Sequence, residues 1–274
     1  MRLRDNFWLW GHPEGRYNMI CGNMKNSRMT PMECCLYLGI RNTFMIPLDV
    51  NVNRRQYNKS FTTLRGVAWE GYAAATKPEL IEPLIEEAKE FPNIRAVAFD
   101  DFVRDGKYKN IDLATLKQVL NRLRTNDVKY LESWMVLYTR EFGADETWDK
   151  EFMDYIEPFD GIMMWTWNEC DYDKIVAKFE RFKEMTPHNR RMFGCYLWNF
   201  GDKKEVSPEA VKFQLDFYRE KIMAGEAEGV ILHTNTMADC DYAAYDAALE
   251  WMNEHGDEEL PESVVAMINS KREV

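Results

Sequence analysis

The sequence predicts an α/β protein that folds as a single (β/α)8 barrel over residues 1–274, with a short C-terminal extension at 260–274. Three observations predict this fold. The chain has 274 residues, close to the ~250 of a complete eight-fold barrel. Short apolar segments alternate with longer helical segments eight times, and no Gly/Ser linker divides them. The competing architecture, a doubly wound open sheet, is disfavoured because no glycine-rich phosphate loop follows the first strand.

The eight strands are expected at short runs of apolar, β-branched and aromatic residues. In chain order these runs are 7–11, 43–48, 66–69, 94–99, 133–138, 161–167, 192–198 and 229–233. In the fourth run, Val97 and Phe99 are the bulkier residues and are expected to face the helices. Ala96, Ala98 and Asp100 then point into the barrel, because side chains alternate along a strand.

A helix is expected after every strand. The first begins at Thr30, which forms a capping box with Glu33, and ends near Gly39. Thr147 is the expected N-cap of the fifth helix, and Ser207 of the seventh. The second helix, between residues 54 and 64, has only a weak pattern. The other expected helices are 77–90, 111–124, 147–156, 171–185, 208–223 and 241–255, with a further short helix from residue 261.

Composition excludes several classes of function. Lys and Arg total 35 and Asp and Glu 46, so the net charge is −11, and nucleic acid is not an expected partner. No apolar run reaches the ~18 residues of a membrane helix, so no membrane association is expected. No secretory signal is present, which indicates a cytoplasmic protein, or a secreted one if a leader has been removed. The six cysteines show no CxxC spacing, and we expect buried free thiols.

Polar and aromatic side chains follow the predicted strands, where the catalytic groups of such barrels lie. The acidic ones are Asp49, Glu70, Asp100, Asp101 and Glu169. The aromatic ones are Trp10, Tyr138, Trp165, Trp167 and Trp198. His12, Asn199, His233 and Asn235 complete the set. Tryptophan faces stack on sugar rings, and Asn, Asp and Glu hydrogen-bond hydroxyl groups, so this set predicts a small-molecule or oligosaccharide substrate.

Three of these acids are the predicted catalytic residues. Asp100 and Asp101 close an apolar strand, and bringing like charges together costs energy, which favours a functional role. The alternative is that one caps the following turn while the other is solvated. Glu169 shares parity with Trp165 and Trp167 if the strand continues; otherwise it opens the next helix. Trp167 is the expected sugar platform, and Trp165 is expected to serve stability.

The order of these acids resembles that of the TIM-barrel glycoside hydrolases, in particular the clan that contains the α-galactosidases. That resemblance implies Asp100 (or Asp101) as the nucleophile and Glu169 as the acid/base, from the ends of strands four and six. This chain has Glu where that clan has Asp after strand six. After strand four it also lacks the Asn-Glu pair of the β-glycosidases, and the adjacent Asp100 and Asp101 are not the spaced aspartates of the chitinases. The predicted reaction is hydrolysis of a glycosidic bond by paired carboxylates, with no cofactor or metal.

Two other functions fit the same residues. A metal-dependent sugar isomerase or aldolase would take ligands from His12, His233, Glu70 and Asp100, although no HxH or HExxH spacing occurs. A non-catalytic carbohydrate-binding barrel would use the tryptophans without matched acids. A divalent metal requirement would identify the first, and saccharide affinity without product would identify the second.

Overall fold

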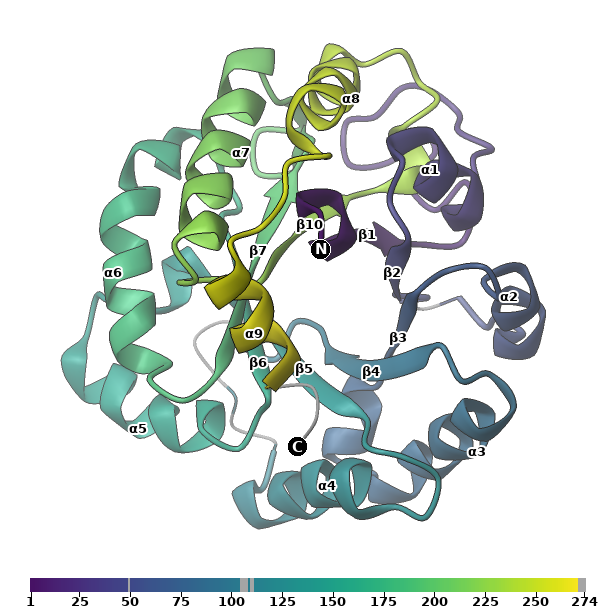
Figure 1. Ribbon diagram of the computed structural model, residues 1–274, viewed down its shortest axis with the longest axis vertical. Helices are drawn as coiled ribbons and strands as arrows, with labels where there is room; N and C mark the ends of the chain where they lie inside the picture. The colour runs from purple at the N-terminus through teal and green to yellow at the C-terminus, as the bar shows by residue number, and fades with distance from the viewer. Residues whose placement is uncertain (49, 104–107, 109–110, 271–274) are drawn as a thin grey trace. The chain divides into compact units, whose positions relative to one another are not determined.

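A computed structural model describes residues 1–48, 50–103, 108 and 111–270 of the chain. Eight strands close a barrel in the order β1-β10-β7-β6-β5-β4-β3-β2, which confirms the predicted fold class. The barrel strands are β1 Phe7–Gly11, β2 Asn42–Met45, β3 Gly66–Glu70, β4 Ile94–Phe99, β5 Glu132–Tyr138, β6 Gly161–Trp165, β7 Arg190–Tyr196 and β10 Gly229–His233. Neighbouring strands such as β4 and β5 run parallel. Figure 1 shows the alternation of strands and helices along the chain.

The helices follow the predicted order, with a 3-10 turn before several of them. They are α1 Pro31–Leu38, α2 Arg54–Ser60, α3 Glu82–Glu90, α4 Leu113–Thr125, α5 Glu146–Ile156, α6 Ile175–Met185, α7 Pro208–Met223, α8 Ala243–His255 and α9 Glu262–Ser270. The weakly patterned second helix therefore exists, and so does the short helix near the C-terminus. No helix in the described ranges is both long and apolar enough to cross a membrane.

Two compact units make up the chain. The first comprises residues 1–43, 166–173 and 191–274, and the second comprises 44–165 and 174–190. In the first unit α1 packs beside β1, and α7 packs beside α8 and β10 (Figure 1). In the second unit α3 packs beside β4, and α4 beside β5.

Local signals in the sequence set several helix ends. Thr30 and Glu33 form the predicted capping box, and Gly39 ends α1 in the left-handed conformation with φ 66°. The predicted cap of α5 is wrong, because Asp145 rather than Thr147 is the N-cap. The Asp145 carboxylate accepts hydrogen bonds from the backbone N–H groups of Thr147 and Trp148, and so satisfies two donors that the helix itself leaves unpaired.

Three strands end earlier than predicted. β2 ends at Met45, before Pro47, which has no N–H to donate, and Leu48, whose φ is 54°. β6 ends at Trp165, and the chain then enters a 3-10 turn at Glu169–Lys174. β7 ends at Tyr196, and the next residues form a separate antiparallel pair, β8 Trp198–Asn199 with β9 Lys204–Glu205. Side-chain alternation therefore cannot be carried past Trp165 or Tyr196.

Candidate active site

Two neighbouring strands of the second unit, β4 and β5, carry polar side chains at their carboxyl ends. Asp100 and Asp101 follow β4 directly, and Tyr138 is the last residue of β5. The side chains of Val97, Ile81 and Leu84 surround Gly71. A Cβ added at this glycine would lie within 4 Å of each of the three. The bulky residues of β4 thus pack among the elements outside the sheet, as the sequence predicted, and Phe99 packs edge-to-face on Phe159. The acids follow a strand that is anchored by these contacts.

Asp100 and Asp101 have different local roles. Asp101 has φ 46°, a left-handed conformation that costs a residue with a Cβ about 1–3 kcal/mol. The Asp101 N–H donates a 2.8 Å hydrogen bond to Oδ1 of Asp100, which supports this turn. The Tyr138 hydroxyl donates to Oδ1 of Asp101 at 3.1 Å. Asp100 therefore stabilises the turn after β4, which is the structural role that the sequence allowed as the alternative for one of the two acids. Asp101 is held against the end of β5.

Glu141 is the third carboxyl group near the ends of these two strands. It lies in the 3-10 turn Thr139–Glu141, and its Oε2 accepts a 2.9 Å hydrogen bond from the Tyr138 N–H. Burial is the main cause that raises the pKa of Glu141 to about 8; the charge of Asp101 acts in the same direction, while that hydrogen bond and Arg140 oppose it. The Glu141 carboxyl is therefore mostly protonated at neutral pH.

Glu141 is a residue that the sequence pattern did not single out. It lies three residues beyond β5, and strand parity gives no information at that distance from the strand end. The only signal was the charged stretch after the fifth strand, Arg140 and Glu141, and a charged stretch after a strand is most often solvated. Its burial becomes visible only in the folded chain.

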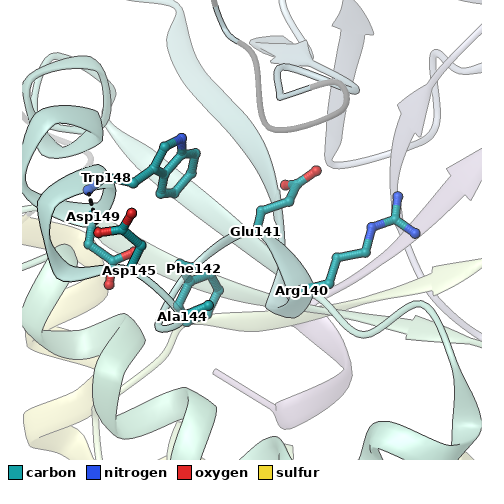
Figure 2. A pocket seen from close by; sticks show the side chains of 7 residues that line it. All are labelled: Arg140, Glu141, Phe142, Ala144, Asp145, Trp148 and Asp149. Atoms are coloured by element: carbon teal, nitrogen blue, oxygen red, sulfur yellow. Dashed lines mark hydrogen bonds between the residues drawn. The ribbon is translucent and has the colours of Figure 1, made fainter.

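A cavity of about 550 Å³ opens beside Glu141. Its walls come from the segment that joins β5 to α5 and from the first turns of α5, and are formed by Arg140, Glu141, Phe142, Ala144, Asp145, Trp148 and Asp149. Figure 2 shows the Glu141 carboxyl and the Trp148 indole pointing to the same side of this segment. The Arg140 guanidinium lies over the Tyr138 ring, 4.9 Å from its centroid. The cavity thus combines one aromatic face with acidic and basic groups.

Other predicted residues of the second unit have structural partners. Oε1 of Glu70 accepts a 2.9 Å hydrogen bond from the Tyr72 N–H, and burial raises the pKa of Glu70. Trp165 is buried in the sheet, opposite Tyr138 in the β5–β6 register, consistent with the stability role predicted for it. Asp49 lies outside the described residues.

The first unit contains a separate cluster of imidazole and aromatic rings. Nε2 of His12 and Nε2 of His233 are 3.3 Å apart, so one ring donates to the other. Burial, and then the charge of His12, lower the pKa of His233 well below 6.5. Tyr196 and Phe200 each have ring centroids 5.0 Å from that of His233. The predicted histidines of neighbouring strands thus meet in an aromatic surrounding.

The remaining predicted residues of the first unit mainly tie loops together. Asn235 accepts from the His12 N–H and donates to the carbonyls of His12 and Met29. Trp198 donates to the Cys21 carbonyl, and Asn199 binds Asp202. Trp10 is buried and pairs with His233 across β1 and β10.

Trp167 and Glu169 both lie beyond the end of β6, so the parity argument for them fails. The Trp167 ring contacts Tyr196 and Phe200, with centroids 5.7 and 5.8 Å away. Oε1 of Glu169 accepts a 2.7 Å hydrogen bond from Oγ of Ser207, the N-cap of α7, and another from its N–H. Glu169 opens a 3-10 turn, as its alternative interpretation held. It belongs to the first unit, whereas Asp100 belongs to the second.

A metal site is not assembled from the part of the chain that the structure describes. No three His, Cys, Asp or Glu side chains in that part lie together as a metal would need. The cysteines are free thiols: Cys34, Cys35, Cys195 and Cys240 are buried as predicted, whereas Cys21 and Cys170 are exposed.

Comparison with known proteins identifies the fold. No family model matches the sequence, and no curated protein matches it. Among solved structures, active domain 2 of a Pyrococcus furiosus chitinase, solved as catalytic site mutants with chito-oligosaccharides, matches with a TM-score of 0.63 at 14% identity over 93% of this chain and 97% of that one.

Two further structures have the same architecture. A GH5_18 protein from Bifidobacterium longum subsp. infantis has a TM-score of 0.58 at 12% identity, over 95% of this chain and 80% of that one. A Burkholderia multivorans amidohydrolase with bound zinc has a TM-score of 0.59 at 10% identity, over 96% and 95%. At these identities the likeness concerns the fold alone: the chain is a (β/α)8 barrel similar to those of chitinases, a GH5 protein and an amidohydrolase.

Proposed function

We propose that this protein hydrolyses a glycosidic bond, with Asp101 and Glu141 as its two catalytic carboxyl groups. The observation that carries the proposal is the pairing of these groups through Tyr138, whose hydroxyl binds Asp101 and whose N–H binds Glu141. Two neighbouring carboxyl groups, one of them kept protonated at neutral pH by its surroundings, are the usual arrangement for this reaction. The substrate class, a saccharide, follows from the chemistry of the pair and from the aromatic groups near it.

In this proposal Glu141 is the general acid. Its proton passes to the glycosidic oxygen while the bond from the anomeric carbon to that oxygen breaks, so the leaving group departs as an alcohol. Asp101, as a carboxylate that accepts from Tyr138, either attacks the anomeric carbon or removes a proton from the attacking water. Asp100 is a positioning residue, since it accepts the Asp101 N–H. The folds of the chitinase and the GH5 protein are compatible with this chemistry.

Glu169, the acid that the sequence predicts, stays the alternative to Glu141. Its carboxylate binds Ser207 at the start of α7, an arrangement that a purely structural residue would also have. Glu141 is preferred because it carries a proton at neutral pH and lines a cavity. Substitutions of Glu141 and of Glu169 should have different effects on kcat/KM if only one of these residues donates the proton.

The test compares substrates with good and poor leaving groups. A screen of dinitrophenyl glycosides and oligosaccharides first identifies the sugar that the wild type cleaves. Glu141→Gln is then expected to lower kcat/KM for the oligosaccharide by about 10²–10⁴-fold, the usual contribution of a general acid. The same variant should lose less than about tenfold on the dinitrophenyl glycoside, because dinitrophenolate leaves without protonation.

Asp101→Asn is expected to lower kcat/KM for both substrates, because Asp101 acts on the anomeric carbon side whatever the leaving group. Glu151→Gln, which changes an exposed acid of α5, is the matched control and should leave both substrates unaffected. The assignment is wrong if Glu141→Gln and Asp101→Asn keep full activity. A leaving-group dependence in Glu169→Gln alone would transfer the acid role to Glu169, and saccharide binding without product would identify a non-catalytic barrel.

A further inference from the structure

We infer that the cavity beside Glu141 is the subsite for the sugar unit on the leaving-group side of the bond that is cleaved, with Trp148 as the surface on which this ring stacks. The inference rests on the proposed function and extends it from single glycosides to substrates with a second sugar. It concerns only residues of the second unit, from the end of β5 to the second turn of α5.

The size and lining of the cavity fit a sugar ring. Its volume of about 550 Å³ lies within the range of ~300–1,000 Å³ that is usual for small-molecule sites. Trp148 offers an aromatic face, while Arg140 and Asp145 are exposed charged groups at its rim that can bind hydroxyl groups. The indole and the Glu141 carboxyl point to the same side of the segment (Figure 2).

Trp148 is held in place from behind. Its ring stacks on Phe152, with centroids 4.7 Å apart and an interplanar angle of 25°, and meets the Tyr108 ring edge-on. Its backbone N–H donates to Oδ1 of Asp145, the N-cap of α5. A stacking surface fixed in this way loses little entropy when a ligand binds.

The position of the proton donor, Glu141, determines which side of the cleaved bond the sugar unit in the cavity belongs to. A general acid must lie within hydrogen-bond reach of the oxygen that leaves. Glu141 itself forms part of the cavity wall, so a group whose oxygen takes its proton lies next to this cavity. Two other acids line the cavity. Asp149 is bound to Arg181 and to the Gly143 N–H, and Asp145 is the N-cap of α5, so neither takes the place of Glu141 beside that oxygen.

The experiment compares a substrate that fills the proposed leaving-group subsite with one that leaves this subsite empty. A disaccharide places a second sugar there, whereas the glycosyl fluoride of the same sugar places a single fluorine atom. Trp148→Ala should lower kcat/KM for the disaccharide by about tenfold and leave that for the fluoride within about twofold. Trp148→Phe keeps an aromatic face and should recover most of the loss. Phe213→Ala removes an exposed aromatic ring of α7 and is the control.

Two results would overturn the inference while the proposed function stands: an equal loss on both substrates, which assigns Trp148 to support of the fold, or no loss on the disaccharide. If the wild type cleaves neither substrate, the proposed function fails separately. The cavity is then judged by calorimetric titration with cellobiose, lactose and N,N′-diacetylchitobiose. Binding of one of them that weakens about tenfold in Trp148→Ala supports the subsite. Absence of binding, or equal binding by the variant, overturns it.

Discussion

At the scale of single residues, two chemically similar acids lie in different surroundings. Glu141 is mostly buried and accepts one backbone hydrogen bond, so the desolvation of its charged form dominates, raises its pKa and lets it keep its proton. Asp101 follows the end of β4 and accepts a hydrogen bond from a hydroxyl group. The left-handed backbone of Asp101 is the local cost of presenting that carboxylate to Tyr138.

The buried His233 should make the free energy of unfolding depend on pH in the acid range. Its folded-state pKa lies well below 6.5 because the ring is buried beside His12, so the unfolded chain takes up a proton in acid that the folded chain does not. The free energy of unfolding should therefore fall as the pH drops through about 6.5, by at most about 1.4 kcal/mol between pH 7.5 and 5.5 for this one group.

Urea unfolding at the two pH values measures this effect. His233→Gln should lose less stability between pH 7.5 and 5.5 than the wild type, by up to that amount, because its side chain does not titrate. His188→Gln, at an exposed position, should behave like the wild type. Equal pH dependence in His233→Gln and the wild type would show that the His12–His233 pair is not the origin of the response.

At the scale of elements, the segment between β5 and α5 is fixed by a buried acid. Both oxygens of Asp149 lie near the Gly143 N–H, and Oδ2 also accepts from Nε of Arg181 in α6 at 2.8 Å. Asp149 is completely buried, and Lys178 donates to the carbonyl of Phe142 in the same segment. Helix α6 thereby holds both the segment that carries Glu141 and the first turns of α5, which carry Trp148.

Asp149→Asn should therefore lower the free energy of unfolding and fix the segment that carries Glu141 less firmly. Removing one partner of a buried ion pair costs about 3–5 kcal/mol, and we expect the lower end because Arg181 is partly exposed and also binds Glu184. Glu146→Gln is the control on the same helix, since its contact with Lys150 is exposed and worth less than about 1 kcal/mol. Thermal or urea unfolding that leaves Asp149→Asn within about 0.5 kcal/mol of the wild type, the range of surface substitutions, would refute this role.

At the scale of the whole molecule, the barrel could be predicted because most of its elements leave a periodic signal in the sequence, the second helix being the weak one. Eight apolar runs and the intervening helices follow from local patterning, and the cap at Thr30 and Glu33 follows from side-chain hydrogen bonding over three residues. The ends of β6 and β7 could not be predicted. They are set by a 3-10 turn and by the pairing of Trp198 with Glu205, which local propensity does not encode.

Only part of the candidate site could be predicted from the sequence, because local propensity does not encode the rest of it either. Asp100 and Asp101 directly follow β4, so their position could be taken from the sequence. The importance of Glu141 depends on how deeply its turn is buried and on the nearness of Asp101, which are properties of the folded chain. Glu169 was selected by an alternation that stops four residues before it, and its role stays a prediction.

The most direct test of the proposed carboxyl pair is a ¹³C NMR titration of the glutamate side chains, which needs no substrate. The signal that disappears in Glu141→Gln belongs to Glu141. It should titrate near pH 8, far above the 4.5 of an ordinary glutamate, and its midpoint should fall in Asp101→Asn, which removes the neighbouring negative charge. A Glu141 signal that titrates near 4.5 would contradict the central claim, because the group would then carry no proton to donate at neutral pH.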